Sequence, residues 1–216
     1  MPSQRFNQMA AEVSRLRKTF VPRGPAGSIL MPSPRHTLRA MAFRLLAHAE
    51  IESYIEERAL QIAQDALTAW RTSGRPSSVT FHMTAFSGVT LNPPPASLTA
   101  PSNRQVDWPA LLDPTKRVVK IYSSYIQDVR KNNHGISERN LLKILLPLGF
   151  KVSDFDPLLI TEINDFSLKR GSVAHRSVRG HVQSGINPLD EFSQVKRIVT
   201  GLKQVDRCFD RISLQL

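Results

Sequence analysis

Cysteine is almost absent from this chain, with Cys208 the only one among 216 residues. No disulfide can form within the chain and no cysteine-based metal site can be assembled. We therefore expect a reducing compartment and place the protein in the cytoplasm. Cys208 falls within a helical pattern with no histidine near it in the sequence, and we expect it to be a small core residue.

Long hydrophobic runs are also missing. No apolar stretch reaches the length that a membrane-spanning helix needs, so no membrane partner is expected. Residues 1–23 carry basic side chains but no continuous apolar region, which argues against a signal peptide.

Aromatic residues make up only 7% of the chain, although 41% of it is hydrophobic. The apolar content is mostly Leu, Ile, Val and Ala, which favours helices over a β-sandwich. Acidic residues are scarce as well: 18 Asp and Glu face 29 Lys and Arg, for a net charge of +11. Such an excess indicates a polyanionic partner such as RNA, DNA or an anionic membrane surface, the alternative being an ordinary basic surface.

Apolar residues at intervals of three and four predict an all-α fold. The first amphipathic helix lies within residues 1–34, followed by a Pro- and Gly-rich linker, and we expect this arm to pack on its own domain or on a partner chain. Residues 35–216 then form the main helical domain, with a Pro- and Ser-rich insertion at 77–114. Within the insertion, residues 79–91 suggest a short strand or hairpin.

A long core helix is predicted from about Arg35 to Thr72, and a last one from Leu189 to about Leu214. Glu52 interrupts the apolar stripe of the long helix, where a carboxylate requires a cationic partner. The stripe comprises Leu38, Ala42, Leu45, Ala49, Glu52, Ile55, Ala59, Ile62, Ala66 and Trp70.

Arg170 precedes His175 by five positions, near the end of another helical pattern. Arginine binds phosphate through a planar fork of donors, and histidine transfers protons near neutral pH. Lys169, Arg176 and Arg179 extend the basic tract and are candidate contacts to an RNA backbone, or part of a loop.

Three stretches together resemble the HEPN superfamily, most closely its RiboL-PSP-HEPN branch. They are the acidic segment 45–57, the segment 132–149 with Asn-Asn-His-Gly-Ile at its start, and the segment from Leu159 to His175 that ends in the R-x4-H motif. The resemblance covers roughly residues 35–212.

The resemblance implies a helical bundle that forms a homodimer with a composite active site. It also implies a ribonuclease without metal or cofactor, of the toxin or antiphage-defence type, with Arg170 and His175 as the catalytic pair. Such an enzyme leaves 2′,3′-cyclic phosphate and 5′-hydroxyl ends on RNA, and a cognate antitoxin or defence partner is expected. Gly171 departs from the family, whose active members often have Asn, Asp or His at this position.

Helix geometry constrains the pair. Five residues of an ideal helix turn about 500°, which leaves Arg170 and His175 about 140° apart. Either the helix breaks near Gly171, or two chains share each pocket. Glu50 and Glu52 are candidates to orient the pair or are ordinary ion-pair partners, and Ser172 binds phosphate or is a helix-terminal hydroxyl.

Two other residues have alternative interpretations. Tyr54 is a core aromatic or stacks on a base. His134 belongs to a turn or is a second catalytic histidine.

Two other functions remain open. The first is a catalytically inactive HEPN module that binds RNA or a partner protein. The second is a DNA-binding regulator, which is the weaker hypothesis because no convincing helix-turn-helix pattern is present.

Overall fold

The computed structural model describes residues 1–24, 29, 31–88, 113–175 and 185–216, and of residues 174 and 175 it describes the backbone alone. The predicted all-α class is confirmed, since the described residues contain helices and no strand. None of the described helices has the length and apolar character needed to cross a membrane. The α-helices are α1 (Gln4–Phe20), α2 (Pro34–Ser73), α3 (Ser78–Phe86), α5 (Pro114–Gln127), α6 (Glu138–Leu145), α7 (Pro157–His175) and α9 (Pro188–Ser213).

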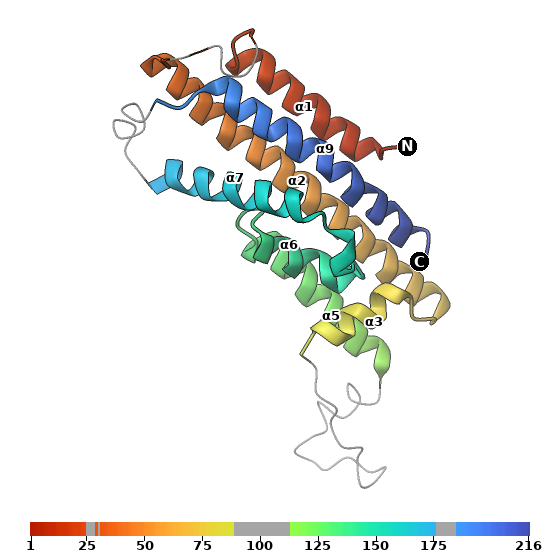
Figure 1. The fold of residues 1–216 in the computed structure, drawn as a ribbon. Helices are drawn as coiled ribbons and strands as arrows, with labels where there is room; N and C mark the ends of the chain where they lie inside the picture. The colour runs from red at the N-terminus through yellow and green to blue at the C-terminus, as the bar shows by residue number, and fades with distance from the viewer. Residues whose placement is uncertain (25–28, 30, 89–112, 176–184) are drawn as a thin grey trace.

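Three long helices form the body of the protein. α1, α2 and α9 run side by side, α7 lies across α2 and α9, and the shorter α3, α5 and α6 gather at one end of α2 (Figure 1). Short turns of other helix types connect them: the π-helix η2 (Asp128–Asn132) and the 3-10 helices η3 (Leu146–Leu148) and η4 (Val152–Asp154).

The bounds of α2 agree with the prediction to within a residue or two, because both ends are set locally. Ser33 caps the first turn in a reciprocal pair with His36, and Pro34 occupies the first helical position. Gly74 ends the helix with φ of 66°, a left-handed conformation that glycine adopts without strain. The 40 residues between give a rod about 60 Å long.

The predicted apolar stripe of α2 is correct in its second half and wrong in its first. Ile55 and Ala59 are buried as expected, but Leu38 is 46% exposed and Leu45 37% exposed. In the first half a neighbouring face is buried instead, because α7 and α9 pack on that side. The buried residues there are Thr37, Ala40, Met41, Phe43, Arg44, Ala47, His48, Ile51 and Tyr54.

The N-terminal arm packs on its own chain. Phe6, Met9 and Val13 are buried against α2 and α9. Ser3 holds the start of α1, since its N–H and hydroxyl donate to the buried Asp206 carboxylate at 2.7 and 2.6 Å. Tyr54 donates to the same carboxylate, so this aromatic residue belongs to the core.

The predicted strand or hairpin within residues 79–91 is wrong for the part that the structure describes. Ser77 caps a helix, α3, that extends to Phe86. Val79 and Met83 face the core, and the Thr80 hydroxyl lies 3.0 Å from the hydroxyl of Tyr122 on α5. Contacts with α5 and η3 therefore outweigh the strand propensity of Val79, Thr80 and Phe81. Residues 89–112 lie outside the described residues.

α7 continues through Gly171 to His175 without interruption. The expected alternative of a helix break near Gly171 is therefore wrong. A Cβ at Gly171 would meet no atom of a described residue within 4 Å, and the helix continues through it, so this glycine marks no kink. Positions 170 and 175 lie about 140° apart around the axis of this helix.

A buried ion pair joins the three helices around the Arg170 segment. Arg44 of α2 donates to both carboxylate oxygens of Glu191 on α9, at 2.8 and 2.7 Å. Its remaining terminal nitrogen donates to the carbonyl of Lys169 on α7 at 3.1 Å. The side chains of Arg44 and Glu191 are 5% and 7% exposed. The Arg44 guanidinium thus fixes α7 at Lys169, the residue directly before Arg170.

We predict that Arg44→Met will cost roughly 3–5 kcal/mol of unfolding free energy, because it leaves the Glu191 carboxylate buried without its cation. Adding Glu191→Met should recover most of that loss, since the unpaired charge is then gone. Urea unfolding of the two single variants and the double variant measures the coupling.

Arg197→Met is the matched control. Arg197 pairs with Glu162 through a side chain that is 58% exposed, and its loss should cost less than about 1 kcal/mol. Equal losses for Arg44→Met and Arg197→Met would contradict the role given to the buried pair.

Candidate active site

Arg170 lies half-buried on α7, and its charge acts on Glu52 of α2. Burial alone would raise the pKa of Glu52. Contact with His48, the Gly135 N–H and the positive charge of Arg170 outweigh burial and bring the pKa below its ordinary value. Arg170 forms no hydrogen bond or salt bridge with another described residue. The charge of Arg170 therefore acts on Glu52 without a salt bridge between the two side chains.

Two carboxylates of α2 hold the turn that follows η2. Glu52 accepts a short hydrogen bond from the N–H of Gly135 and a long one, 3.5 Å, from the amide of Asn133. The same amide donates to Glu56 at 2.6 Å. The predicted cationic partner of Glu52 is thus only part of the arrangement, because the closest contact of this carboxylate is the N–H group of Gly135.

Gly135 is required by the shape of this turn. Its φ of 111° is a conformation that other residues rarely adopt, and a Cβ there would meet the ring of His48 at 3.5 Å. Asn140 of α6 donates to the Gly135 carbonyl at 3.1 Å. The turn is therefore fixed from α2 and from α6, beside the Arg170 segment.

His48 is a site residue that the sequence did not single out. Its ring is 1% exposed and lies against Phe166 of α7, with ring centroids 5.7 Å apart. Nδ1 lies 3.5 Å from Glu52, whereas Nε2 is buried with no hydrogen-bond partner among the described residues. The amide oxygen of Asn133 is in the same condition. Two buried polar atoms of this cluster thus lack a described partner, a feature that recurs at functional sites.

Three other predicted site residues are Glu50, Ser172 and Lys169, which the structure places on α2 and α7. Glu50 makes no hydrogen bond or salt bridge with a described residue, so it does not join the cluster. The Ser172 hydroxyl donates to the Lys169 carbonyl at 2.8 Å within α7. The Lys169 ammonium donates to Gln194 of α9 at 2.8 Å, which directs it toward α9.

Several predictions fall on parts that are not described. The backbone of His175 lies in the last turn of α7, but its side chain is outside the described part of the chain. Arg176 and Arg179 lie outside the described residues entirely. His134 is exposed in the turn beside Gly135.

Within the described ranges, no group of three or more His, Cys, Asp or Glu side chains is placed to hold a metal ion. The cluster around Glu52 instead combines two carboxylates, an amide and a buried imidazole, and the charge of Arg170 acts on Glu52. Such a set can bind an anion at the guanidinium and keep that guanidinium oriented by the Glu52 charge.

No family model matches the chain, and searches of curated proteins and of solved structures found no match either. The resemblance to the HEPN superfamily therefore stays a prediction that rests on the residues quoted above.

The lowered pKa of Glu52 predicts a pH-dependent contribution to stability. Because the folded pKa lies below the ordinary 4.5, the contribution is fully present above that value and is lost as the pH falls through the folded pKa. We expect Glu52→Gln to unfold about 1–2 kcal/mol more easily at neutral pH, since the amide replaces a charged acceptor. The difference from wild type should shrink in acid.

Glu50→Gln is the control, two positions away on the same helix. Chemical unfolding at neutral pH and in acid compares the two variants with wild type. If Glu50→Gln shows the same pH-dependent loss, or Glu52→Gln shows none, the Glu52 contacts do not contribute as described.

Proposed function

We propose that the protein is a metal-independent endoribonuclease of the HEPN type. The observation that carries this proposal is the position of Arg170: it is half-buried on α7 and forms no hydrogen bond or salt bridge with a described residue, which leaves its fork of donors for a phosphate. His175 follows on the same helix, and the net charge of +11 suits an RNA substrate.

RNA brings its own nucleophile, the 2′-hydroxyl. His175 takes the proton of that hydroxyl or protonates the leaving 5′-oxygen. Arg170 binds the phosphate and stabilises the charge that develops on its oxygens. Glu52 holds the guanidinium in place through its own charge. The products are a 2′,3′-cyclic phosphate and a 5′-hydroxyl, and DNA, which lacks the nucleophile, is not cleaved.

A homodimer completes the site in this proposal. An unbroken α7 separates positions 170 and 175 by about 140° around its axis, so one pocket draws these two residues from different chains. An exposed apolar strip of α2 supports the interface: Leu38 and Leu45 lie on the same helix face as Glu52, and Leu46 flanks them at 43% exposed. An apolar strip that leads to the active site suits an isologous contact.

The toxin or defence role, a cognate antitoxin and the cytoplasmic location belong to the same proposal. They follow from the family resemblance and from the near-absence of cysteine.

A second candidate function is a catalytically inactive HEPN module that binds RNA or a partner protein. Gly171 favours it, because the unbroken helix carries no polar side chain directly after Arg170. In that case RNA or a partner binds without turnover, and His175→Ala changes the binding little.

We predict RNA cleavage in the presence of EDTA, with the all-DNA strand of the same sequence left intact. His175→Ala should reduce the rate by at least about 100-fold, the usual contribution of a general acid or base. Arg170→Ala should reduce it by roughly 100- to 1,000-fold through lost transition-state stabilisation. Gel analysis of a labelled oligonucleotide measures the rates.

The control variants are His82→Ala and Arg71→Ala, which remove a histidine of α3 and an exposed arginine near the end of α2. Both should retain wild-type rates. A requirement for Mg²⁺, or full activity in His175→Ala, would refute the proposed mechanism. RNA binding without cleavage would instead support the inactive module.

We further predict that mixing the inactive Arg170→Ala and His175→Ala proteins restores activity. After subunit exchange, a heterodimer whose sites each combine residues from both chains contains one intact site. Random exchange should therefore return about a quarter of the wild-type activity. Sites built within single chains would regain none.

Leu45→Lys tests the interface itself. It should weaken the dimer, as measured by light scattering during gel filtration, because it places a charge on the apolar strip. Leu158→Lys is the control. It changes another exposed leucine, at the start of α7 and away from the apolar strip, and should leave the dimer intact. A wild-type monomer at micromolar concentration would contradict the two-chain site.

A further inference from the structure

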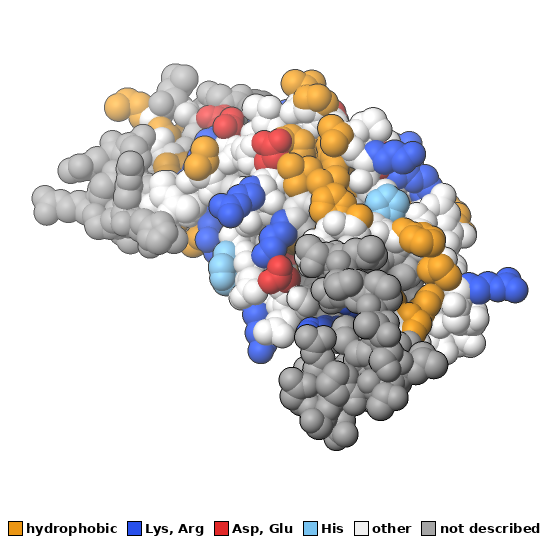
Figure 2. Space-filling view, turned by 90° about the horizontal axis from the view of Figure 1, so that it is seen from below, with side chains coloured by type: hydrophobic (Ala, Val, Ile, Leu, Met, Phe, Trp, Pro, Cys, Tyr) orange, Lys and Arg blue, Asp and Glu red, His pale blue; other side chains and the backbone are white. Residues whose placement is uncertain are grey.

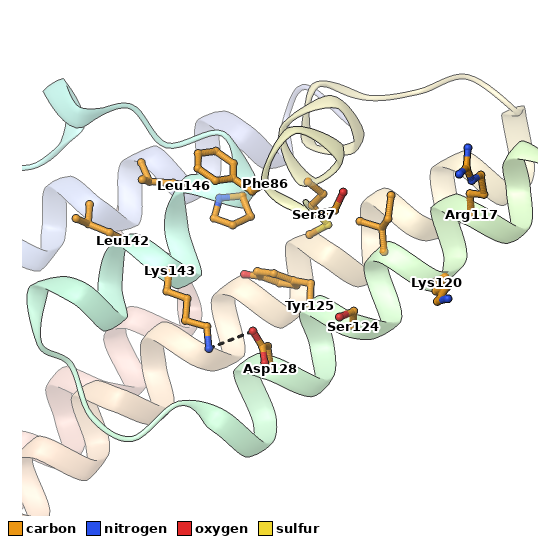
Figure 3. Close-up of a pocket in the computed structure, with 13 residues that line it drawn as sticks. Phe86, Ser87, Arg117, Lys120, Ser124, Tyr125, Asp128, Leu142, Lys143 and Leu146 are labelled. Carbon is orange, nitrogen blue, oxygen red and sulfur yellow. Dashed lines mark ion pairs between the residues drawn. The ribbon is translucent and has the colours of Figure 1, made fainter. Parts of the chain in front are cut away.

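A cavity of about 620 Å³ opens between α3, α5 and α6, away from the Arg170 segment. Its volume falls within the range that small-molecule sites occupy, about 300–1,000 Å³. Side chains from all three helices and from η3 line it, and Figure 3 shows them facing a common space. The lining residues are Met83, Phe86, Ser87, Arg117, Lys120, Ile121, Ser124, Tyr125, Asp128, Leu142, Lys143, Leu146 and Pro147.

The walls of this cavity are mostly apolar. Phe86 of α3 and Tyr125 of α5 lie on opposite sides of it (Figure 3), with Leu142 and Leu146 beside them. Phe86 is 57% exposed, so part of its ring is open to a ligand. The Tyr125 hydroxyl is already used, since it donates to the Ile144 carbonyl at 2.8 Å. The tyrosine therefore offers the cavity its ring.

The charged residues of the cavity carry an excess of positive charge. At one end Lys143 pairs with Asp128 at 3.1 Å, and the same carboxylate accepts from Asn132 at 2.6 Å. Arg117 and Lys120 stand along α5 toward the other end and form no salt bridge with a described residue (Figure 3). Two cations thus remain for a ligand.

The surrounding surface has the same mixed character. On the face seen from below in Figure 2, apolar side chains form a band with lysine and arginine side chains on either side of it. A ligand that binds here meets apolar contacts in the cavity and positive charge around it.

We infer that this cavity binds a small organic anion with an unbranched apolar body, namely a medium-chain carboxylate. The chain lies between Phe86 and Tyr125, and the carboxylate meets Arg117 and Lys120. A nucleotide fits less well, because Ser87 and Ser124 are the remaining uncharged polar side chains and the Ser87 hydroxyl already donates to the Thr84 carbonyl at 2.7 Å. This inference does not rest on the proposed ribonuclease activity.

Titration calorimetry of the full chain with decanoate, below its micelle concentration, tests the inference. We expect saturable binding of one decanoate per chain. Decyltrimethylammonium, with the same chain and the opposite charge, should bind at least about tenfold more weakly, and acetate should not bind measurably, because each lacks one of the two contacts. Binding of adenosine monophosphate in preference to decanoate would overturn the proposal.

Paired variants locate the site. Arg117→Gln with Lys120→Gln should weaken decanoate binding roughly tenfold, whereas Arg130→Gln with Lys131→Gln, an equal loss of charge outside the cavity, should leave it unchanged. Ile121→Trp should block binding by filling the cavity. Circular dichroism confirms that each variant is folded. Equal weakening by both double variants, or unimpaired binding in folded Ile121→Trp, would show that the cavity is not the site.

Discussion

The buried ion pair between Arg44 and Glu191 is the interaction on which the arrangement of the site depends. Two charged groups removed from water are stable only when each satisfies the other, and here the guanidinium also binds the Lys169 carbonyl. This one side chain of α2 therefore sets the position of both α9 and α7. Arg170 follows directly on the fixed residue, so its approach to Glu52 is a consequence of the same contact.

Both carboxylates of the candidate site, Glu52 and Glu56, come from α2. Glu52 and Glu56 accept hydrogen bonds from the turn at 133–135. These bonds fix α2 against the segment that leads into α6. The pKa of Glu52 is lowered despite burial, because contact with His48, the Gly135 N–H and the charge of Arg170 favour the carboxylate. A carboxylate whose pKa is lowered, acting on an arginine that has no salt bridge with a described residue, can orient that arginine while leaving its fork of donors for a phosphate.

The sequence was sufficient where local chemistry decides the structure. Gly74 ends α2, Asn187 and Pro188 start α9, and Gly149 closes the α6 segment in a left-handed conformation. It was insufficient where tertiary contacts decide. The first half of α2 is apolar on more than one face, so periodicity alone did not identify the buried one, and α3 adopts a helix despite strand-forming residues. His48 precedes Glu52 by four positions, a spacing that places both on one helix face, whereas no local pattern shows that Asn133 also meets Glu52.

The central claim, that Arg170 and His175 cleave RNA through its own 2′-hydroxyl, is tested most directly by the chemistry of the new ends. Mass spectrometry of the fragments from a defined RNA incubated with the protein in EDTA would identify them. We expect the upstream fragment to end in a 2′,3′-cyclic phosphate and the downstream fragment to begin with a 5′-hydroxyl. Fragments with a 3′-hydroxyl and a 5′-phosphate would contradict it, because such ends require an attacking water in place of the 2′-hydroxyl.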